Sequence, residues 1–171
     1  MQQPDARRHV LAFLSRRRHP QTMVDSLTRA QRSAHMRKIR SRDTAPELLV
    51  RRGLHALGYR FQVAGCGLPG KPDVVFRRRR KVIFVHGCFW HSHEGCPIAH
   101  IPKTRQDYWR GKFEVNRIRD RQDLLNLETL GWAALIVWEC ETAKMPELLA
   151  KLTNFLGPTR VLATGHEVDG G

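Results

Sequence analysis

Alternation of apolar and polar positions divides the chain into helices and short strands joined by loops that contain glycine and proline. The first clear helix is expected from Thr44 to about Leu57, since Thr44 and Glu47 fit a capping box and Pro46 suits the first turn. Gly58 then supplies a stop signal. The helix is expected to bury its leucines, which are Leu48, Leu49, Leu54 and Leu57.

Four short apolar runs are typical of strands, and they occupy residues 59–63, 72–76, 81–85 and 132–137. The third run is wholly apolar after Lys81, so it is expected at the centre of a sheet. Four consecutive arginines, residues 77–80, form the turn that precedes it.

Two more helices are expected, over residues 105–131 and 145–156. Apolar residues recur at helical spacing in the longer one and predict its buried stripe, formed by Tyr108, Val115, Ile118 and Leu125. A polar ridge runs beside that stripe, because Lys112, Asn116 and Asp120 follow one another four residues apart. The order of elements predicts an α/β or α+β domain with a mixed sheet between helices.

Length and charge indicate how the chain is organised. Its 171 residues are expected to form one domain over residues 23–157, followed by a flexible tail over residues 158–171. Residues 1–22 fit either a basic arm that binds phosphates or a disordered extension outside the fold, and we favour the extension. The net charge of +14 predicts a polyanionic partner, and a basic helix over residues 28–40 is expected to lie along nucleic acid.

The sequence also predicts a location for the protein. It contains no apolar stretch long enough for a membrane span and no secretory signal, so the chain is expected in the cytoplasm. Cysteines in that compartment are reduced, which favours metal binding over disulfides.

Histidines, cysteines and aromatic residues gather over residues 84–96, a combination that neither a core nor a plain surface loop requires. The set that could close around one structural zinc ion is Cys88, His93, Cys96 and Cys140. His91 could replace His93 as a ligand, since spacing alone does not separate them. The alternative is a set of free cysteines, some of them buried as small apolar residues.

Asp73 begins a strand one hairpin before this cluster, which is the layout of nucleases that hold Mg²⁺ at a sheet edge. A simple Pro-Asp turn is the alternative. Because the following strand carries no acid and no lysine beyond its first residue, His86 and His91 are the candidate general bases. The backbone carbonyl of Val85 could complete the protein ligands of the metal.

Five runs stand out in combination: residues 68–73 (LPGKPD), 84–91 (FVHGCFWH), 104–109 (TRQDYW), 116–120 (NRIRD) and 135–140 (LIVWEC). Together they resemble the very short patch repair DNA mismatch endonuclease family, over about residues 23–156. The resemblance implies a restriction-endonuclease-like fold and an enzyme that nicks one strand 5′ to the thymine of a T:G mismatch, left when 5-methylcytosine deaminates. It also implies catalytic Mg²⁺, structural zinc, a duplex DNA substrate, a monomeric chain and mismatch-repair proteins as further partners. The location that it implies is a prokaryotic cytoplasm, near the nucleoid.

The resemblance also assigns roles to single residues. It implies that Asp73 and the Val85 carbonyl hold Mg²⁺ and that Glu47 helps to hold the water shell of the metal. It makes His91 the catalytic histidine, supported by Asp120. The zinc ligands that it implies are Cys88, His93, Cys96 and Cys140. The sequence departs from the family pattern in one place, since one additional residue between His93 and Cys96 enlarges the zinc loop.

Further residues are expected to contact DNA. The resemblance places His86 beside the scissile phosphate, and it matches three aromatic residues to those that wedge between base pairs at the mismatch: Phe89, Trp90 and Trp109. Such wedges unstack a weak step at modest cost, although the three could equally be core aromatics. Lys112 and Asn116, on the polar ridge, are also expected to bind DNA. Two other functions stay open: a restriction enzyme that cuts both strands, and a non-catalytic zinc module that binds DNA.

Overall fold

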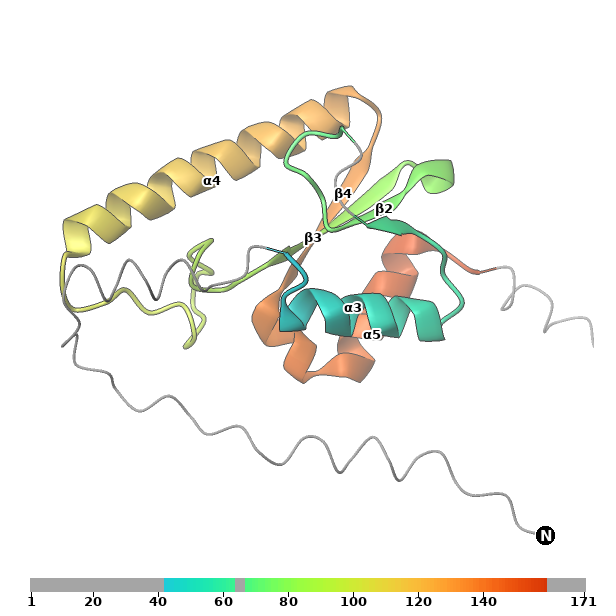
Figure 1. Ribbon diagram of the computed structural model, residues 1–171, viewed down its shortest axis with the longest axis horizontal. Coiled ribbons are helices and arrows are strands. Elements are labelled where there is room, and N and C mark those ends of the chain that lie inside the picture. The colour runs from blue at the N-terminus through green and yellow to red at the C-terminus, as the bar shows by residue number, and fades with distance from the viewer. Residues whose placement is uncertain (1–41, 64–66, 160–171) are drawn as a thin grey trace, which may run out of the picture. The chain divides into compact units, whose positions relative to one another are not determined.

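The computed structural model describes residues 42–63 and 67–159, and within them the chain forms one sheet with helices on both faces (Figure 1). The predictions for residues 1–22 and 28–40, and for the tail beyond Thr159, lie outside these ranges. The α-helices in the described residues are α3 (Ala45–Ala56), α4 (Gln106–Thr129) and α5 (Met145–Leu156). The strands are β1 (Gln62–Val63), β2 (Val74–Phe76), β3 (Lys81–His86) and β4 (Ala133–Trp138).

The sheet has the order β1-β2-β3-β4 and is mixed. β1, β2 and β3 pair antiparallel, whereas β3 and β4 pair in parallel. The prediction of a mixed sheet between helices is therefore confirmed, as is the position of residues 81–85 inside the sheet.

Alternate residues of the strands supply two hydrophobic cores, as a period of two requires. On one face, the core residues of the sheet are Val74, Phe76, Ile83 and Val137, which pack with residues of α3 and α5. On the other face, Val75, Val82 and Phe84 pack with Leu127 of α4. In Figure 1 α3 and α5 accordingly lie together, and α4 lies across the opposite face.

The arginine-rich turn between β2 and β3 binds the ends of two helices. Arg79 donates through Nη1 to the Leu156 carbonyl at 2.7 Å, and Arg80 donates through Nη2 to the Leu130 carbonyl at 2.7 Å. Lys81 Nζ lies 2.6 Å from the carbonyl of Phe155. Cations at the carboxyl ends of helices satisfy free carbonyls and favour the helix dipole, so part of the basic charge of this chain is structural.

The prediction for the buried face of α3 is only partly correct. Leu54 is buried, but Leu48 is exposed, and the other buried positions are Val50 and Glu47. Glu47 can be buried because Thr44 Oγ1 and the backbone N–H of Asp43 both donate to its carboxylate. Thr44 is the N-cap residue, as expected, although its side chain does not cap the backbone of the first turn.

The predicted buried stripe of α4 is wrong. The exposed fractions of Tyr108, Val115, Ile118 and Leu125 are 53%, 62%, 62% and 48%. The helix instead buries Phe113, Asn116 and Leu127, so part of the expected polar ridge faces inward. Although α4 has 24 residues, no helix in the described part of the chain is long and apolar enough to cross a membrane.

Candidate active site and metal centre

The parallel pairing of β3 and β4 brings the chemistry-bearing segments of the chain together. His86 is the register partner of Trp138, so both strands end at the same edge of the sheet. The loop that follows β3 carries the His/Cys cluster, and the short 3-10 helix Glu139–Ala143 follows β4. Residues about fifty positions apart can therefore contribute to one site.

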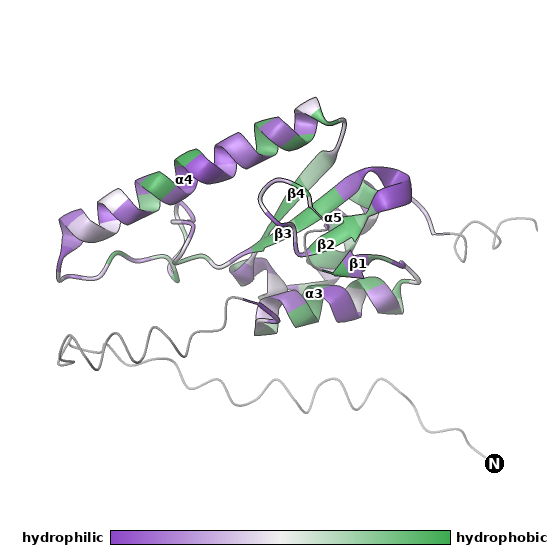
Figure 2. Ribbon diagram, turned by 45° about the horizontal axis from the view of Figure 1, so that its top comes forward, coloured by the Kyte–Doolittle hydropathy of each residue, from purple (hydrophilic) through white to green (hydrophobic). Residues whose placement is uncertain are grey.

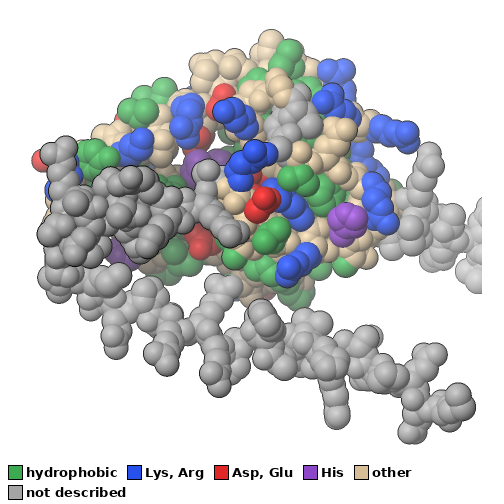
Figure 3. Space-filling view, viewed as in Figure 1, with side chains coloured by type: hydrophobic (Ala, Val, Ile, Leu, Met, Phe, Trp, Pro, Cys, Tyr) green, Lys and Arg blue, Asp and Glu red, His purple; other side chains and the backbone are tan. Residues whose placement is uncertain are grey.

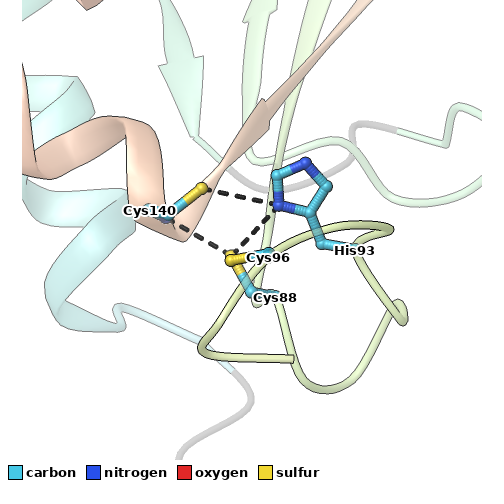
Figure 4. Close-up of side chains that lie close together, drawn as sticks. All are labelled: Cys88, His93, Cys96 and Cys140. Atoms are coloured by element: carbon cyan, nitrogen blue, oxygen red, sulfur yellow. Dashed lines mark hydrogen bonds between the residues drawn. The ribbon is translucent and has the colours of Figure 1, made fainter. Parts of the chain in front are cut away.

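The first group at this edge consists of three cysteines and one histidine: Cys88, His93, Cys96 and Cys140 (Figure 4). Their ligand atoms all lie within 4.8 Å of one another. His93 Nδ1 is 3.6 Å from Cys88 Sγ and 3.5 Å from Cys140 Sγ. The Cys140 backbone N–H donates to Cys88 Sγ at 3.4 Å, and the His93 ring stacks on Trp138 with a centroid distance of 4.0 Å. This group could hold a metal ion.

The second group is formed by His86, His91 and Asp120. His91 Nδ1 lies 2.5 Å from Asp120 Oδ2, which links the loop after β3 to α4. The His86 and His91 rings stack with a centroid distance of 3.7 Å and an interplanar angle of 13°. Burial is the main cause that lowers the pKa of His86, to about 4, and the charge of the neighbouring His91 is the second. His86 is therefore neutral near pH 7.

The stacking of these two rings opposes a shared metal ion, even though the three side chains are close enough to hold one. The lone pairs of imidazole nitrogens lie in the ring planes. Nearly parallel rings that are stacked face to face therefore direct their lone pairs side by side and not toward a common point. As arranged, the second group suits proton transfer better than metal binding.

Asp73 lies just before β2 and is tied to the middle of the sheet. Its backbone N–H donates to the Ile83 carbonyl at 3.0 Å, and its Oδ2 accepts the N–H of Val85 at 2.7 Å. Burial raises the pKa of Asp73 to about 6, despite the hydrogen bond from Val85. The charge of Glu47 raises this pKa further, and that of Arg51 lowers it. A partly buried carboxylate with a raised pKa is a candidate functional group. A bound cation would offset the free energy that burial of the ionised carboxylate costs.

Arg51 is a residue of this site that the sequence interpretation missed. It donates to Glu47 Oε2 at 2.9 Å and to Asp43 Oδ1 at 2.5 Å, and its side chain is 12% exposed. Its Nε is buried and has no hydrogen-bond partner among the described residues. The spacing of four residues after Glu47 was the available signal, because such pairs meet on one face of a helix.

The aromatic residues form a third group beside the histidines. Phe89, Trp90 and Trp109 meet edge to face with centroid distances of 5.1 Å, 5.2 Å and 6.3 Å, and all three are half-buried. Asn116 is buried, and its Nδ2 donates to the Trp90 carbonyl at 2.9 Å. The amide of Asn116 thus fixes the backbone of the aromatic loop, while Lys112 is exposed.

The structure places the predicted site residues in these separate groups. It puts His93 with the cysteines and His91 with Asp120, a choice that sequence spacing had left open. The backbone N–H of Val85 donates a hydrogen bond to Asp73, and Glu47 is close enough to Asp73 to raise the pKa of Asp73. A mixed sheet between helices, with a buried carboxylate and a His–Asp pair at its edge, defines a restriction-endonuclease-like nuclease.

Comparisons with known proteins identify the family within this class. The family model described as DNA mismatch endonuclease Vsr matches residues 24–96. The chain is 47% identical over 137 residues to a type II nicking enzyme, V.XorIIP, of Xanthomonas oryzae pv. oryzae, covering 80% of this chain and 100% of that protein. It is 47% identical over 118 residues to the DNA mismatch endonuclease Vsr of Escherichia coli, covering 69% and 75%. A type II nicking enzyme of Neisseria meningitidis, V.NmeAIP, is 42% identical over 119 residues, covering 70% and 84%. The chain belongs to the Vsr family of DNA mismatch endonucleases.

Proposed function

We propose that this endonuclease nicks one strand of duplex DNA 5′ to the thymine of a T:G mismatch and requires Mg²⁺. The observation that carries the proposal is the His91–Asp120 pair, which lies beside His86 at the end of β3. The sequence motifs shared with mismatch endonucleases and the names of the relatives support the choice of substrate.

The residues around Asp73 fit a hard cation. Carboxylate and carbonyl oxygens are the protein ligands that Mg²⁺ prefers, and one or two of them suffice. With Oδ2 bonded to Val85, the other oxygen of Asp73 and the Val85 carbonyl are the donors that would hold the ion. When bound, Mg²⁺ would supply positive charge to the phosphate. Glu47, whose oxygens are held by Thr44, Asp43 and Arg51, fixes a second negative charge near Asp73.

His91 is the residue proposed to accept a proton from the attacking water. Asp120 engages Nδ1, which leaves Nε2 as the basic nitrogen of the ring. The carboxylate also stabilises the imidazolium that forms when the proton is transferred. His86, neutral because of its burial, can donate a hydrogen bond to a phosphate oxygen without a change in charge.

Zinc is the metal that best fits the group of Cys88, His93, Cys96 and Cys140. A tetrahedral zinc ion with ordinary bond lengths separates a sulfur from a nitrogen ligand by about 3.6 Å, close to the two measured distances of 3.6 Å and 3.5 Å. Four protein ligands leave no position for water, so the ion would be structural. It would tie the loop after β3 to the end of β4 and so hold His91 in place.

The aromatic cluster and the basic surface suit a DNA duplex in which a mismatch weakens the stacking between neighbouring base pairs. Phe89, Trp90 and Trp109 are half-buried, so they remain accessible as wedges, and Asn116 holds the loop that carries two of them. On the face drawn in Figure 3, Lys and Arg side chains are spread over the surface and acidic side chains are few. Phosphate contacts from such cations, including Lys112, make binding strongly dependent on salt.

Cleavage of a panel of duplexes tests the proposal. With Mg²⁺ present, a T:G duplex should be nicked only 5′ to the thymine, and the matched T:A and C:G duplexes should stay intact. Cutting of both strands of a matched duplex would favour a restriction enzyme instead. Tight binding without any cleavage, at all Mg²⁺ concentrations, would favour a non-catalytic module.

A further inference from the structure

Arg119 belongs to the sequence motif of residues 116–120, yet it has no role in the mechanism proposed above. Its Nη2 lies 3.3 Å from Asp120 Oδ1, while Oδ2 of the same carboxylate contacts His91. Successive residues of a helix do not face each other, so the Arg119 side chain must turn along the helix surface to reach Asp120. One carboxylate thus links the guanidinium of Arg119 to the proposed general base.

Arg119 lies on the side of α4 that borders the proposed active site. Lys112, Asn116 and Arg119 are four and three residues apart, so they share one side of the helix. Figure 2 shows hydrophilic bands along α4 between hydrophobic ones. Burial is the main cause that lowers the pKa of His86, and the positive charge of Arg119 lowers it further. The guanidinium is therefore within electrostatic range of His86, the residue proposed to bind the phosphate.

The Arg119–Asp120 ion pair contributes little to the stability of the fold. The arginine side chain is 59% exposed, and exposed ion pairs are weak because water screens them. Asp120 also has His91 as a partner. A guanidinium carries five N–H donors, and the contact with Asp120 engages one nitrogen, Nη2. The exposed guanidinium is therefore accessible to a phosphate of bound DNA.

The proposed reaction needs positive charge beside the scissile phosphate, and Mg²⁺ would supply part of it. Strand β3 ends at the site, but its lysine, Lys81, lies at the opposite end of the strand and binds the Phe155 carbonyl. His86 is neutral near pH 7. A guanidinium would add both charge and a fork of N–H groups that matches phosphate oxygens.

We propose that Arg119 is a further catalytic residue, whose guanidinium binds a non-bridging oxygen of the scissile phosphate. This inference rests on the nicking activity proposed above. Asp120 would orient both partners, His91 through Oδ2 and Arg119 through Oδ1. Negative charge accumulates on the phosphate oxygens in the transition state, so the cation should affect the rate of cleavage more than the affinity for DNA.

Single-turnover nicking and equilibrium binding of a T:G duplex by the full, zinc-loaded chain test this role. Arg119→Met should lower the rate at saturating enzyme by about 10²-fold or more, the usual effect of removing one donor to transition-state charge, and should change the Kd far less. Arg119→Lys keeps the charge without the fork of donors, so it should lose less. Arg117→Met is the matched control and should cut at the unaltered rate, because Arg117 is 60% exposed on the same helix and pairs with Glu114.

Sulfur substitution of each non-bridging oxygen at the cleavage site locates the contact. On one phosphorothioate diastereomer, which lacks the oxygen that Arg119 binds, Arg119→Met should slow cleavage by a smaller factor than on the ordinary duplex. On the other diastereomer the factor should stay the same. Equal factors on all three duplexes would overturn the proposal. So would an Asp120→Asn/Arg119→Met double variant that is no slower than Asp120→Asn, because Arg119 would then act only through Asp120.

Failure of this inference differs from failure of the proposed function. If the unaltered protein nicks the T:G duplex and Arg119→Met nicks it equally fast, the inference alone is overturned. If the unaltered protein cuts a different duplex, the proposed substrate is wrong, and the same comparison applies to that duplex because a phosphate contact does not depend on the bases. A protein that cuts no duplex would overturn both. Unfolding temperature and zinc content would verify that each variant is folded.

Discussion

His91 and Asp120 are joined by a contact of 2.5 Å between Nδ1 and Oδ2, although 29 positions separate them in the chain. His91 lies in the loop after β3, and Asp120 lies on the inward face of α4. The long helix therefore contributes a side chain to the proposed active site as well as covering the sheet. In the proposed mechanism, its contribution is to fix the ring orientation and the tautomer of His91.

This contact predicts that substitutions of His91 and Asp120 reduce the rate of nicking by different factors. His91→Ala should slow single-turnover nicking of a T:G duplex by about 10²- to 10⁴-fold, the usual contribution of a general base. Asp120→Asn should slow it less, because the His91 ring, although less well oriented, can still accept the proton of the attacking water. Both variants should bind mismatched DNA as the unaltered protein does. If His91→Ala instead loses zinc and unfolds, His91 is a metal ligand and the assignment is wrong.

Asp73 predicts a dependence of stability on pH in the metal-free protein. Its pKa is raised from 3.8 to about 6 in the folded state, so the folded state holds the proton more tightly than the unfolded state. The stabilisation is complete below pH 3.8 and is lost as the pH rises through about 6. At pH 7.5 the free energy of unfolding of the Asp73→Asn variant should therefore exceed that of the unaltered protein by up to about 3 kcal/mol. Urea unfolding at equilibrium measures this difference.

A comparison of the two proteins at two pH values separates the effect of Asp73 from those of the other titratable groups. At pH 4 the free energies of unfolding of Asp73→Asn and the unaltered protein should converge, because Asp73 is then protonated in the folded state. Saturating Mg²⁺ should stabilise only the protein that retains Asp73. A constant difference between the two proteins across this pH range would contradict the burial argument.

The cysteine group predicts a loss of metal and of stability. Cys140→Ser should reduce the zinc content from about one ion per chain and lower the unfolding temperature, because the proposed ion would tie the end of β4 to the loop after β3. Cys66→Ser is the matched control, since Cys66 is the remaining cysteine of the sequence and is not among the four proposed ligands, and it should retain zinc. Metal analysis of freshly purified protein measures both. Equal zinc contents in the two variants would contradict the assignment.

Loss of Arg51 should make the stability of the protein more dependent on Mg²⁺. Arg51→Met leaves Glu47 buried without its cation, so it should lower the free energy of unfolding by about 3 kcal/mol in the absence of Mg²⁺. Mg²⁺ should raise the unfolding temperature of this variant more than that of the unaltered protein, because the ion restores positive charge near the carboxylates. Arg52→Met, at an exposed position on the same helix, should behave as the unaltered protein does.

Much of the fold could be predicted from the sequence because local patterns determine it. The prediction of a helix over residues 145–156 coincides with α5, and the runs at residues 81–85 and 132–137 correspond to β3 and β4. The candidate site residues were predicted from local spacing and from the family resemblance. The pairing of β3 with β4, which brings their ends to one edge of the sheet, was not predicted.

The orientation of α4 could not be predicted, because the helix carries apolar residues on two opposite faces. Periodicity detects a face such as that of Val115 and Ile118, but it does not tell which face meets the sheet. The burial of Glu47 was missed for a related reason. A charged residue is buried only when partners satisfy it, and here these are Thr44, the Asp43 backbone and Arg51.

The most direct test of the central claim is single-turnover nicking of a T:G duplex labelled on both strands, titrated with Mg²⁺. The unaltered protein should produce one break, 5′ to the mismatched thymine, at a rate that rises with Mg²⁺ and saturates. Asp73→Asn should bind the same duplex without cutting it at any Mg²⁺ concentration. Cleavage that is independent of Mg²⁺ or of Asp73, or equal cleavage of a matched C:G duplex, would contradict the account.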